Sequence, residues 1–400
     1  MTDTDTARWR RLALLAFAVV GGMSTWFAGS VAAPLRAADL ALTSGEVGWL
    51  VSGVQLGFVL GTLLIAVLNI ADVVPGRRLF AVSALGAAMA NAALLVAPTL
   101  PWLVASRLAT GFCLAGVYPP AMKMAATWFR HSRGLAIGTV VGALTIGKAL
   151  PYLLQGNGAV AIELVVLVPS LAALAAAVLI GTTWHDGPHA FPARPFHWGL
   201  IGEVVRDGPL RRVTGGYLGH MWELYAFWAW VPGFLTAAAA ARGEVATAHG
   251  TAAFTIVAIG AIGCVGGGLL ADRIGRRQVV RGAMLLSGTL AALSPLLFGA
   301  PAWLLMAALL VWGIAVIADS AQFSALATEL APPHAVGTAL ALQTSLGFLL
   351  TIASIQLVPM LADALGWRWA LAVLAVGPLV GVGVLRTRVN GERRGQHGET

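Results

Sequence analysis

The sequence has 400 residues, of which 58% are hydrophobic and 10% charged, with a mean hydropathy of +0.83. Soluble globular chains are about 45–50% apolar and about 25% charged, so this composition excludes a soluble enzyme, a disordered chain and a secreted disulfide scaffold. The formal net charge of +8 comes mostly from basic residues in short connections between apolar runs, which is typical of an integral membrane protein rather than of nucleic-acid binding.

Apolar runs along the chain predict twelve transmembrane helices, because each is close to the about 20 residues that cross a bilayer. Alternating strands of the outer-membrane type are absent, so the sequence predicts an all-α helical bundle rather than a barrel. The predicted spans are 12–33, 47–70, 79–97, 102–127, 135–154, 159–183, 213–236, 250–270, 279–299, 302–327, 338–361 and 368–385.

Basic residues between the spans predict the orientation. With the N-terminus inside, cytoplasmic segments hold 19 of the 25 Lys and Arg, and the other side holds only Arg36, Arg242 and Arg368. This bias predicts cytoplasmic termini and a multi-pass protein of the cytoplasmic (inner) membrane. A cleaved signal peptide is the alternative for the first span, but eleven further spans favour a retained helix.

The longest polar connection, His185–Arg212, divides the chain into a first bundle (1–184), a linker (185–212) and a second bundle with a short tail (213–400). Its apolar residues predict a short helix lying on the cytoplasmic leaflet, with one apolar face. These residues are Phe196, Leu200, Ile201, Val204 and Val205.

The two bundles repeat each other. The connection after the second span, 71–78, and the one after the eighth, 271–277, both begin Ala-Asp and end Arg-Arg. The fifth span opens at Gly134 and the eleventh at Gly337. Equivalent connections six spans apart indicate a parallel duplication.

These motifs resemble the major facilitator superfamily. Residues 268–277 look like a full copy of its loop signature G-x-L-a-D-R-x-G-R-R, whereas the first copy departs from it at Asn69 and Pro75. Arg107 and Gly111 are similar to the R-x-x-x-G motif of the family's fourth span. The resemblance implies two six-helix pseudo-symmetric bundles, alternating access without a cofactor, and a monomer.

The resemblance also implies a gate on the cytoplasmic side. Asp72 would contact the start of the eleventh span near Gly337, and Asp272 the start of the fifth near Gly134. The neighbouring arginines would pair with cytoplasmic acids such as Glu329. The gating residues are therefore Asp72, Arg77, Asp272, Arg273 and Arg276.

Ionisable residues inside spans are costly and indicate function. Glu223 lies near the midplane of the seventh span with His220 and Phe227 on its face, and it is a candidate proton carrier. The alternative is a protonated glutamic acid that joins helices. Asp319 of the tenth span is a second coupling candidate, and its alternative is a structural pair with Lys123.

Two cations are candidates in the first bundle. Lys148, with Tyr152 one turn away, would attract a carboxylate; alternatively it pairs with Glu223 or Glu163, or extends towards the membrane surface. Arg107, near the outer end of the fourth span, belongs by resemblance to conformational or proton-coupling networks, and we expect water to reach it.

Uncharged candidates lie at midplane depth. Trp26, Tyr118 and Gln343 are predicted to line the substrate site with Lys148, Tyr152, His220 and Phe227. Pro119 and Pro120 predict an interruption of the fourth span.

No P-loop occurs, so either an ion gradient supplies the energy or the protein is a facilitator. A buried carboxyl beside a histidine favours protons, and cations in the first bundle favour an anionic substrate. The sequence therefore predicts a proton-coupled symporter of a small organic anion. Its alternatives are antiport efflux of amphipathic compounds and a non-transporting membrane sensor on the same fold.

Overall fold

The computed structural model describes residues 3–129, 132–158, 160–189, 195–244 and 249–386, and the regular structure of this part is entirely helical. It contains twelve helical segments long and apolar enough to cross a membrane, as the hydropathy predicts. They are Thr6–Ala37, Ser44–Val67, Gly76–Leu95, Leu100–Trp128, Gly134–Gln155, Ile162–Thr183, Gly208–Ala241, Gly250–Ile274, Arg276–Leu297, Ala302–Leu330, Val336–Leu365 and Trp367–Leu385.

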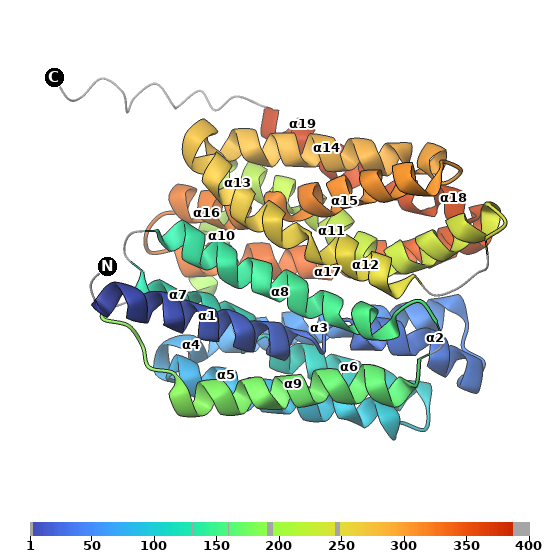
Figure 1. Ribbon diagram of the computed structural model, residues 1–400. Helices are drawn as coiled ribbons and strands as arrows, with labels where there is room; N and C mark the ends of the chain where they lie inside the picture. Colours follow the sequence, from blue (N-terminus) through green and yellow to red (C-terminus); the bar gives the residue numbers. More distant parts are fainter. Residues whose placement is uncertain (1–2, 130–131, 159, 190–194, 245–248, 387–400) are drawn as a thin grey trace.

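The helices of the first six spans form one layer, and those of the last six form a second layer (Figure 1). The first layer comprises α1 (Asp3–Met23), α2 (Ala28–Leu40), α3 (Ser44–Val67), α4 (Ile70–Val73), α5 (Gly76–Ala92), η1 (Ala93–Leu95), α6 (Leu100–Leu114), α7 (Tyr118–Trp128), α8 (Arg133–Gln155) and α9 (Ile162–Thr183). The remaining helices are η2 (Trp198–Leu200), α10 (Ile201–Arg206), α11 (Gly208–Ala241), α12 (Gly250–Ala258), α13 (Gly260–Ile274), α14 (Arg276–Leu297), α15 (Ala302–Ala318), α16 (Ser320–Leu330), α17 (Val336–Leu365), α18 (Trp367–Ala370), η3 (Leu371–Ala375) and α19 (Val376–Arg386).

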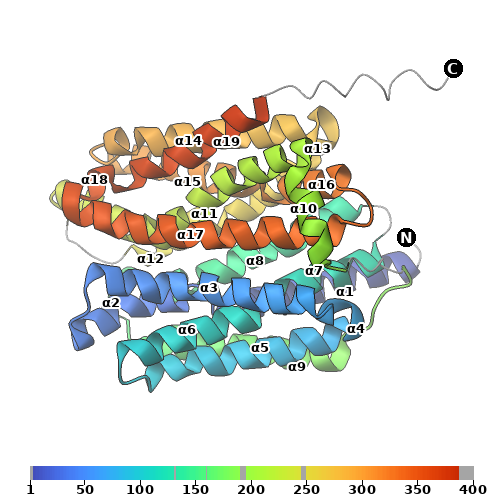
Figure 2. The ribbon, with the colours of Figure 1, turned by 180° about the vertical axis from the view of Figure 1, so that it is seen from behind.

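Helix α1 begins and α19 ends at the same end of the bundle, which we call the terminal end; α2 and α18 lie at the opposite end (Figures 1 and 2). The layers meet where α3 packs on α17 and where α8 packs on α12 and α13. Within the first layer, α3 and α6 approach so closely that a Cβ on Gly111 would lie 1.9 Å from the carbonyl oxygen of Val54. Only glycine fits this crossing.

Several spans are interrupted, and other spans satisfy the carbonyls that the interruptions release. The fourth span breaks at 115–117, directly before Pro119 and Pro120 as predicted. The first breaks at 24–27 and the tenth at Asp319, where no proline announces it. In α11, Pro232 frees the carbonyl of Trp228. Since lipid offers no hydrogen bonds, such groups need protein partners.

The linker lies against both layers at the terminal end. The backbone amide of Phe196 donates to Oδ1 of Asn69 (3.2 Å), and that of His197 donates to Oγ1 of Thr338 (2.9 Å). Asn69 has a φ of 50°, a left-handed conformation that asparagine tolerates, which accounts for its place in the first loop copy.

The predicted apolar face of the linker is wrong in detail. Helix α10 has six residues, and it packs on α11 and α17, so Val204 is buried while Val205 is 50% exposed. The protein interior, rather than a membrane surface, therefore receives part of that face.

Candidate functional site

Aromatic rings from both layers enclose the ammonium group of Lys148. Its Nζ lies 3.6 Å from the ring centroid of Trp26, 4.4 Å from that of Tyr225 and 5.9 Å from that of Trp228. It also donates a hydrogen bond to the Tyr225 hydroxyl. We call Lys148 and the rings in contact around it the Lys148 cage: Trp26, Phe27, Phe58, Tyr152, Tyr225, Trp228 and Phe348.

Five elements build the cage. Helix α8 places Lys148 and Tyr152 one turn apart, and the break in the first span contributes Trp26 and Phe27. Phe58 comes from α3 and Phe348 from α17, while α11 supplies Tyr225 and Trp228. The Tyr152 hydroxyl donates to the carbonyl oxygen of Trp228 (2.9 Å), the one that Pro232 releases. Pro232 of the second layer thus leaves a carbonyl free to accept a hydrogen bond from Tyr152 of the first layer.

The cage presents hydrogen-bond donors and no counter-charge. Among the described residues, no carboxylate lies within 4.0 Å of Lys148, so neither predicted pairing partner, Glu223 or Glu163, neutralises it. The side chain is 1% exposed and does not extend to the membrane surface. The buried Nε1 atoms of Trp26 and Trp228 have no hydrogen-bond partner in the described structure. A buried cation without an ion partner costs several kcal/mol (~3–5), and an anion would relieve that cost.

Arg107 supports the break in the first span. Its Nη2 donates to the carbonyl oxygen of Trp26, its Nη1 to that of Thr25 (3.2 Å), and its Nε to that of Leu50 (3.3 Å). Nη1 also lies 3.4 Å from Oδ1 of Asn91. Arg107 is 0% exposed, so the expectation that water reaches it is wrong. It is packed beneath the broken backbone instead of facing the membrane surface.

A second polar cluster lies inside the second layer. Nδ1 of His220 is 2.9 Å from Oδ1 of Asp319, which occupies the break between α15 and α16. The Glu223 carboxyl contacts Ser287 Oγ and Trp312 Nε1, both at 2.7 Å. The predicted alternative of an Asp319–Lys123 pair is wrong, because Lys123 is engaged elsewhere.

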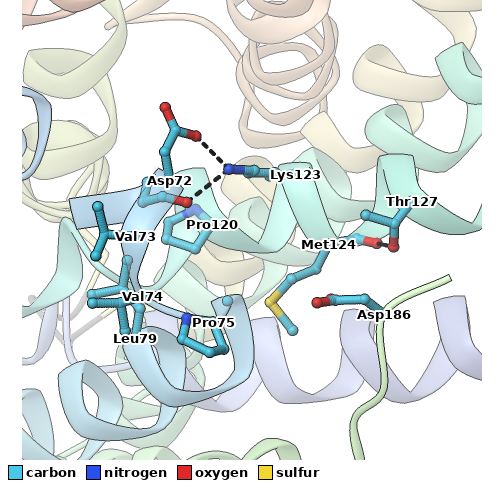
Figure 3. A pocket seen from close by; sticks show the side chains of 12 residues that line it. Asp72, Val73, Val74, Pro75, Leu79, Pro120, Lys123, Met124, Thr127 and Asp186 are labelled. Carbon is cyan, nitrogen blue, oxygen red and sulfur yellow. Dashed lines mark hydrogen bonds and ion pairs between the residues drawn. The ribbon is translucent and has the colours of Figure 1, made fainter. Parts of the chain in front are cut away.

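Lys123 instead contacts the first copy of the repeated loop. Its Nζ donates to Oδ1 of Asp72 (2.6 Å) and to the carbonyl oxygen of Ala71 (2.7 Å), at the edge of a pocket of about 310 Å³ (Figure 3). No hydrogen bond joins Asp72 to Gly337 among the described residues, so the expected contact is replaced by one within the first layer. The pocket is lined by residues of the first layer and by Asp186 of the linker, and none of its lining residues belongs to the Lys148 cage.

The second loop copy is partly as expected. Nε of Arg276 donates to Glu329 (2.7 Å), as predicted, and Nη1 donates to Gln322 (2.9 Å). Asp272 and Arg273 are exposed, and the described residues show no hydrogen bond or ion pair from Asp272 to Gly134. Arg77 is partly exposed.

The other predicted site residues are not among the side chains in contact around Lys148. Phe227 stacks on Trp312 inside the second layer, with ring centroids 4.2 Å apart. Tyr118 is partly buried at the start of α7. Gln343 is buried on α17, and its Oε1 has no hydrogen-bond partner among the described residues. The structure therefore joins Trp26, Lys148 and Tyr152 in the cage, and Tyr118 lies within electrostatic reach of the cage residue Tyr225.

Sequence reasoning missed five rings of the cage: Phe27, Phe58, Tyr225, Trp228 and Phe348. One available signal was the helical spacing of Met221, Tyr225 and Trp228, which share a face of α11 other than the one carrying His220 and Glu223. Phe58 and Phe348 carried no such signal, because apolar rings are more often core than ligand.

Comparisons with known proteins agree with this architecture. The model of the Major Facilitator Superfamily matches residues 13–353. A curated relative, the niacin transporter NiaP of Acinetobacter baylyi (strain ATCC 33305 / BD413 / ADP1), is 33% identical over 124 residues. That match spans 28% of this chain and 28% of the relative's length.

Solved structures share the fold at low sequence identity. A bacterial homologue of the human lysosomal transporter Spinster, in an inward-facing and unoccupied conformation, has a TM-score of 0.71 at 14% identity, covering 96% of this chain and 97% of its own. The human organic anion transporter MFSD10 (TETRAN) has a TM-score of 0.69 at 16% identity, covering 95% and 99%.

Proposed function

We propose, from the premise that the chain belongs to the major facilitator superfamily, that it takes up a small organic anion together with a proton by alternating access. The observation that carries the proposal is the Lys148 cage, where a buried cation has a hydroxyl and aromatic faces around it but no carboxylate among the described residues. A substrate carboxylate would supply the missing charge.

The aromatic walls of the cage support a particular substrate class. Rings of Trp26, Tyr225 and Phe348 pack on one another with centroids 5.1–5.8 Å apart, and a planar ring that enters when the layers part could form contacts of the same kind, each worth about 0.5–1.5 kcal/mol. We therefore propose a planar aromatic monocarboxylate. Niacin, which the name of the partial relative gives as its substrate, belongs to this class.

Alternating access follows from the origin of the cage residues. Trp26 and Trp228 are both 0% exposed and belong to different layers, so a substrate reaches Lys148 only when the layers part. Towards the end of the bundle opposite the terminal end, the Ser44 hydroxyl donates a hydrogen bond to the Asp363 carboxylate. Nε2 of Gln356 donates to Oγ of Ser52 (3.1 Å). We propose that these contacts hold the layers together there while the terminal end opens to the cytoplasm.

The coupling proton is proposed to reside in the buried cluster of the second layer, which contains His220, Glu223 and Asp319. Moving one proton with one monocarboxylate adds no net charge to the interior, which keeps the cost of crossing the bilayer low.

Proteoliposomes loaded with a pH dye test the function. Nicotinate or benzoate added outside should acidify the lumen, whereas a transporter that exports amphipathic compounds by antiport should alkalinise it under an opposing gradient. Absence of acidification with every aromatic carboxylate tried would contradict the proposal.

A further inference from the structure

Helix α11 carries two chemically different faces. Tyr225 and Trp228 point towards Lys148, whereas His220 and Glu223 contact groups inside the second layer. The anion cage and the acid cluster are therefore separated by the helix itself. Each of the three ionisable groups in the cluster, including Asp319, is at most 2% exposed.

Both oxygens of Glu223 have hydrogen-bond partners whether or not the group is charged. Trp312 Nε1 can only donate, so Oε1 accepts. The Ser287 hydroxyl can donate to Oε2 or accept from it, and it can also donate to the carbonyl oxygen of Met284 (3.4 Å). A glutamine at this position would keep the whole set: its Oε1 would accept from Trp312 and its amide would donate to Ser287.

The His220–Asp319 pair, in contrast, contains polar atoms without hydrogen-bond partners. Nδ1 of His220 lies 2.9 Å from Oδ1 of Asp319, an ion-pair distance, but the contact is not aligned as a hydrogen bond, and both Nε2 and Oδ1 lack a hydrogen-bond partner among the described residues. A neutral imidazole that carries its proton on Nδ1, the nitrogen nearer the carboxylate, has a lone pair on Nε2, which can take one proton. The rings of Tyr217 and Phe323 lie 5.9 and 5.7 Å from the imidazole.

We propose that the His220–Asp319 pair holds the coupling proton and that Glu223 is a structural carboxyl joining α11 to α14 and α15. This inference rests on the proton coupling of the proposed function. The step breaks an O–H bond of a hydronium ion from the acidic side, releases a water molecule and forms one N–H bond at Nε2, so that a neutral imidazole beside a carboxylate becomes an imidazolium–carboxylate pair. The pair's net charge rises from −1 to 0 as the anion enters.

Other titratable groups surround the pair. Tyr217 and Glu223 lie on α11, Cys264 and Glu223 are within electrostatic reach of Asp319, and Arg276 donates to Gln322, one turn after Asp319. None of the ion pairs in the described residues joins a cation other than His220 to Asp319. The proton is therefore assigned to the histidine of the pair.

Three variants separate the two roles: Asp319→Asn, His220→Gln and Glu223→Gln. Each is reconstituted and assayed for nicotinate accumulation under an acid-outside gradient of about 1 pH unit, and for counterflow exchange without a gradient. One proton per anion supports about tenfold accumulation per pH unit. We expect Glu223→Gln to accumulate like the wild type, and Asp319→Asn and His220→Gln to exchange nicotinate without accumulating it.

Accumulation by both Asp319→Asn and His220→Gln would overturn the assignment, as would its loss in Glu223→Gln with exchange intact. If Asp319→Asn does not reach the membrane, His220→Gln decides. A wild type that exchanges nicotinate but never accumulates it would instead contradict the proposed coupling, independently of which residue holds the proton.

Discussion

Arg107 donates a hydrogen bond to the backbone carbonyl of Trp26, the residue whose indole ring lies against the Lys148 ammonium. Arg107 of the fourth span and Lys148 of the fifth, both buried cations, therefore contact the same residue of the first span, Trp26. Arg107 fixes the backbone where the first span is interrupted, and Lys148 uses the ring that this interruption presents.

Replacing Arg107 with lysine tests that support. Lysine keeps the charge but cannot reach the carbonyls of Thr25, Trp26 and Leu50 together, and each buried acceptor left alone costs about 1–3 kcal/mol. We expect a lower Tm in detergent and loss of nicotinate binding. Unchanged Tm and binding would show that the break does not depend on the guanidinium.

Gly29→Ala tests the same region from the other side. A Cβ at Gly29 would lie 2.2 Å from Nε of Arg107, so the guanidinium would have to move. Gly266, in α13, has no atom within 4 Å of its added Cβ and provides the matched control. We expect Gly29→Ala to lower Tm and Gly266→Ala to leave it unchanged or raise it, since alanine favours helix. Equal effects would contradict the packing.

A double-mutant cycle tests the bond between Tyr152 and the Trp228 carbonyl. Tyr152→Phe leaves that carbonyl without its partner, at a cost of about 1–3 kcal/mol. Pro232→Ala restores the backbone donor, so Tyr152→Phe should cost less in that background. Thermal unfolding measures the difference, and additive effects would argue against the proline as the origin of the free carbonyl.

Asp72 and Lys123 are predicted to affect turnover rather than binding. Their side chains are 23% and 30% exposed, so the pair should contribute at most about 1 kcal/mol to stability. We expect Asp72→Asn and Lys123→Ala to change the transport rate while nicotinate affinity stays the same. A large loss of affinity in either would contradict a gating role.

The sequence predicted what depends on local pattern. The twelve spans follow from hydropathy, the break before Pro119 from the missing amides, and the Arg276–Glu329 contact from the family signature. The break at 24–27 was not predicted, because Arg107, whose side chain donates hydrogen bonds to the freed carbonyls, lies on another span.

The site was only half predictable for the same reason. Lys148 and Trp26 were selected because a buried charge is costly and an aromatic at midplane depth is suggestive. Their meeting with Tyr225, and the separation of Phe227 from them, depend on how α11 is turned against α8 and α15. Nothing in one helix's sequence fixes that rotation relative to its neighbours.

The central claim is that Lys148 selects a carboxylate, and the most direct test compares nicotinate with nicotinamide, which has the same ring and no charge. Calorimetric titration of the purified protein should show nicotinate binding about tenfold or more tightly, because a hydrogen bond to a charged group contributes about 1.5–3 kcal/mol. Lys148→Ala should abolish the preference. Equal affinity for the two compounds in the wild type, or a preference that survives Lys148→Ala, would contradict the account.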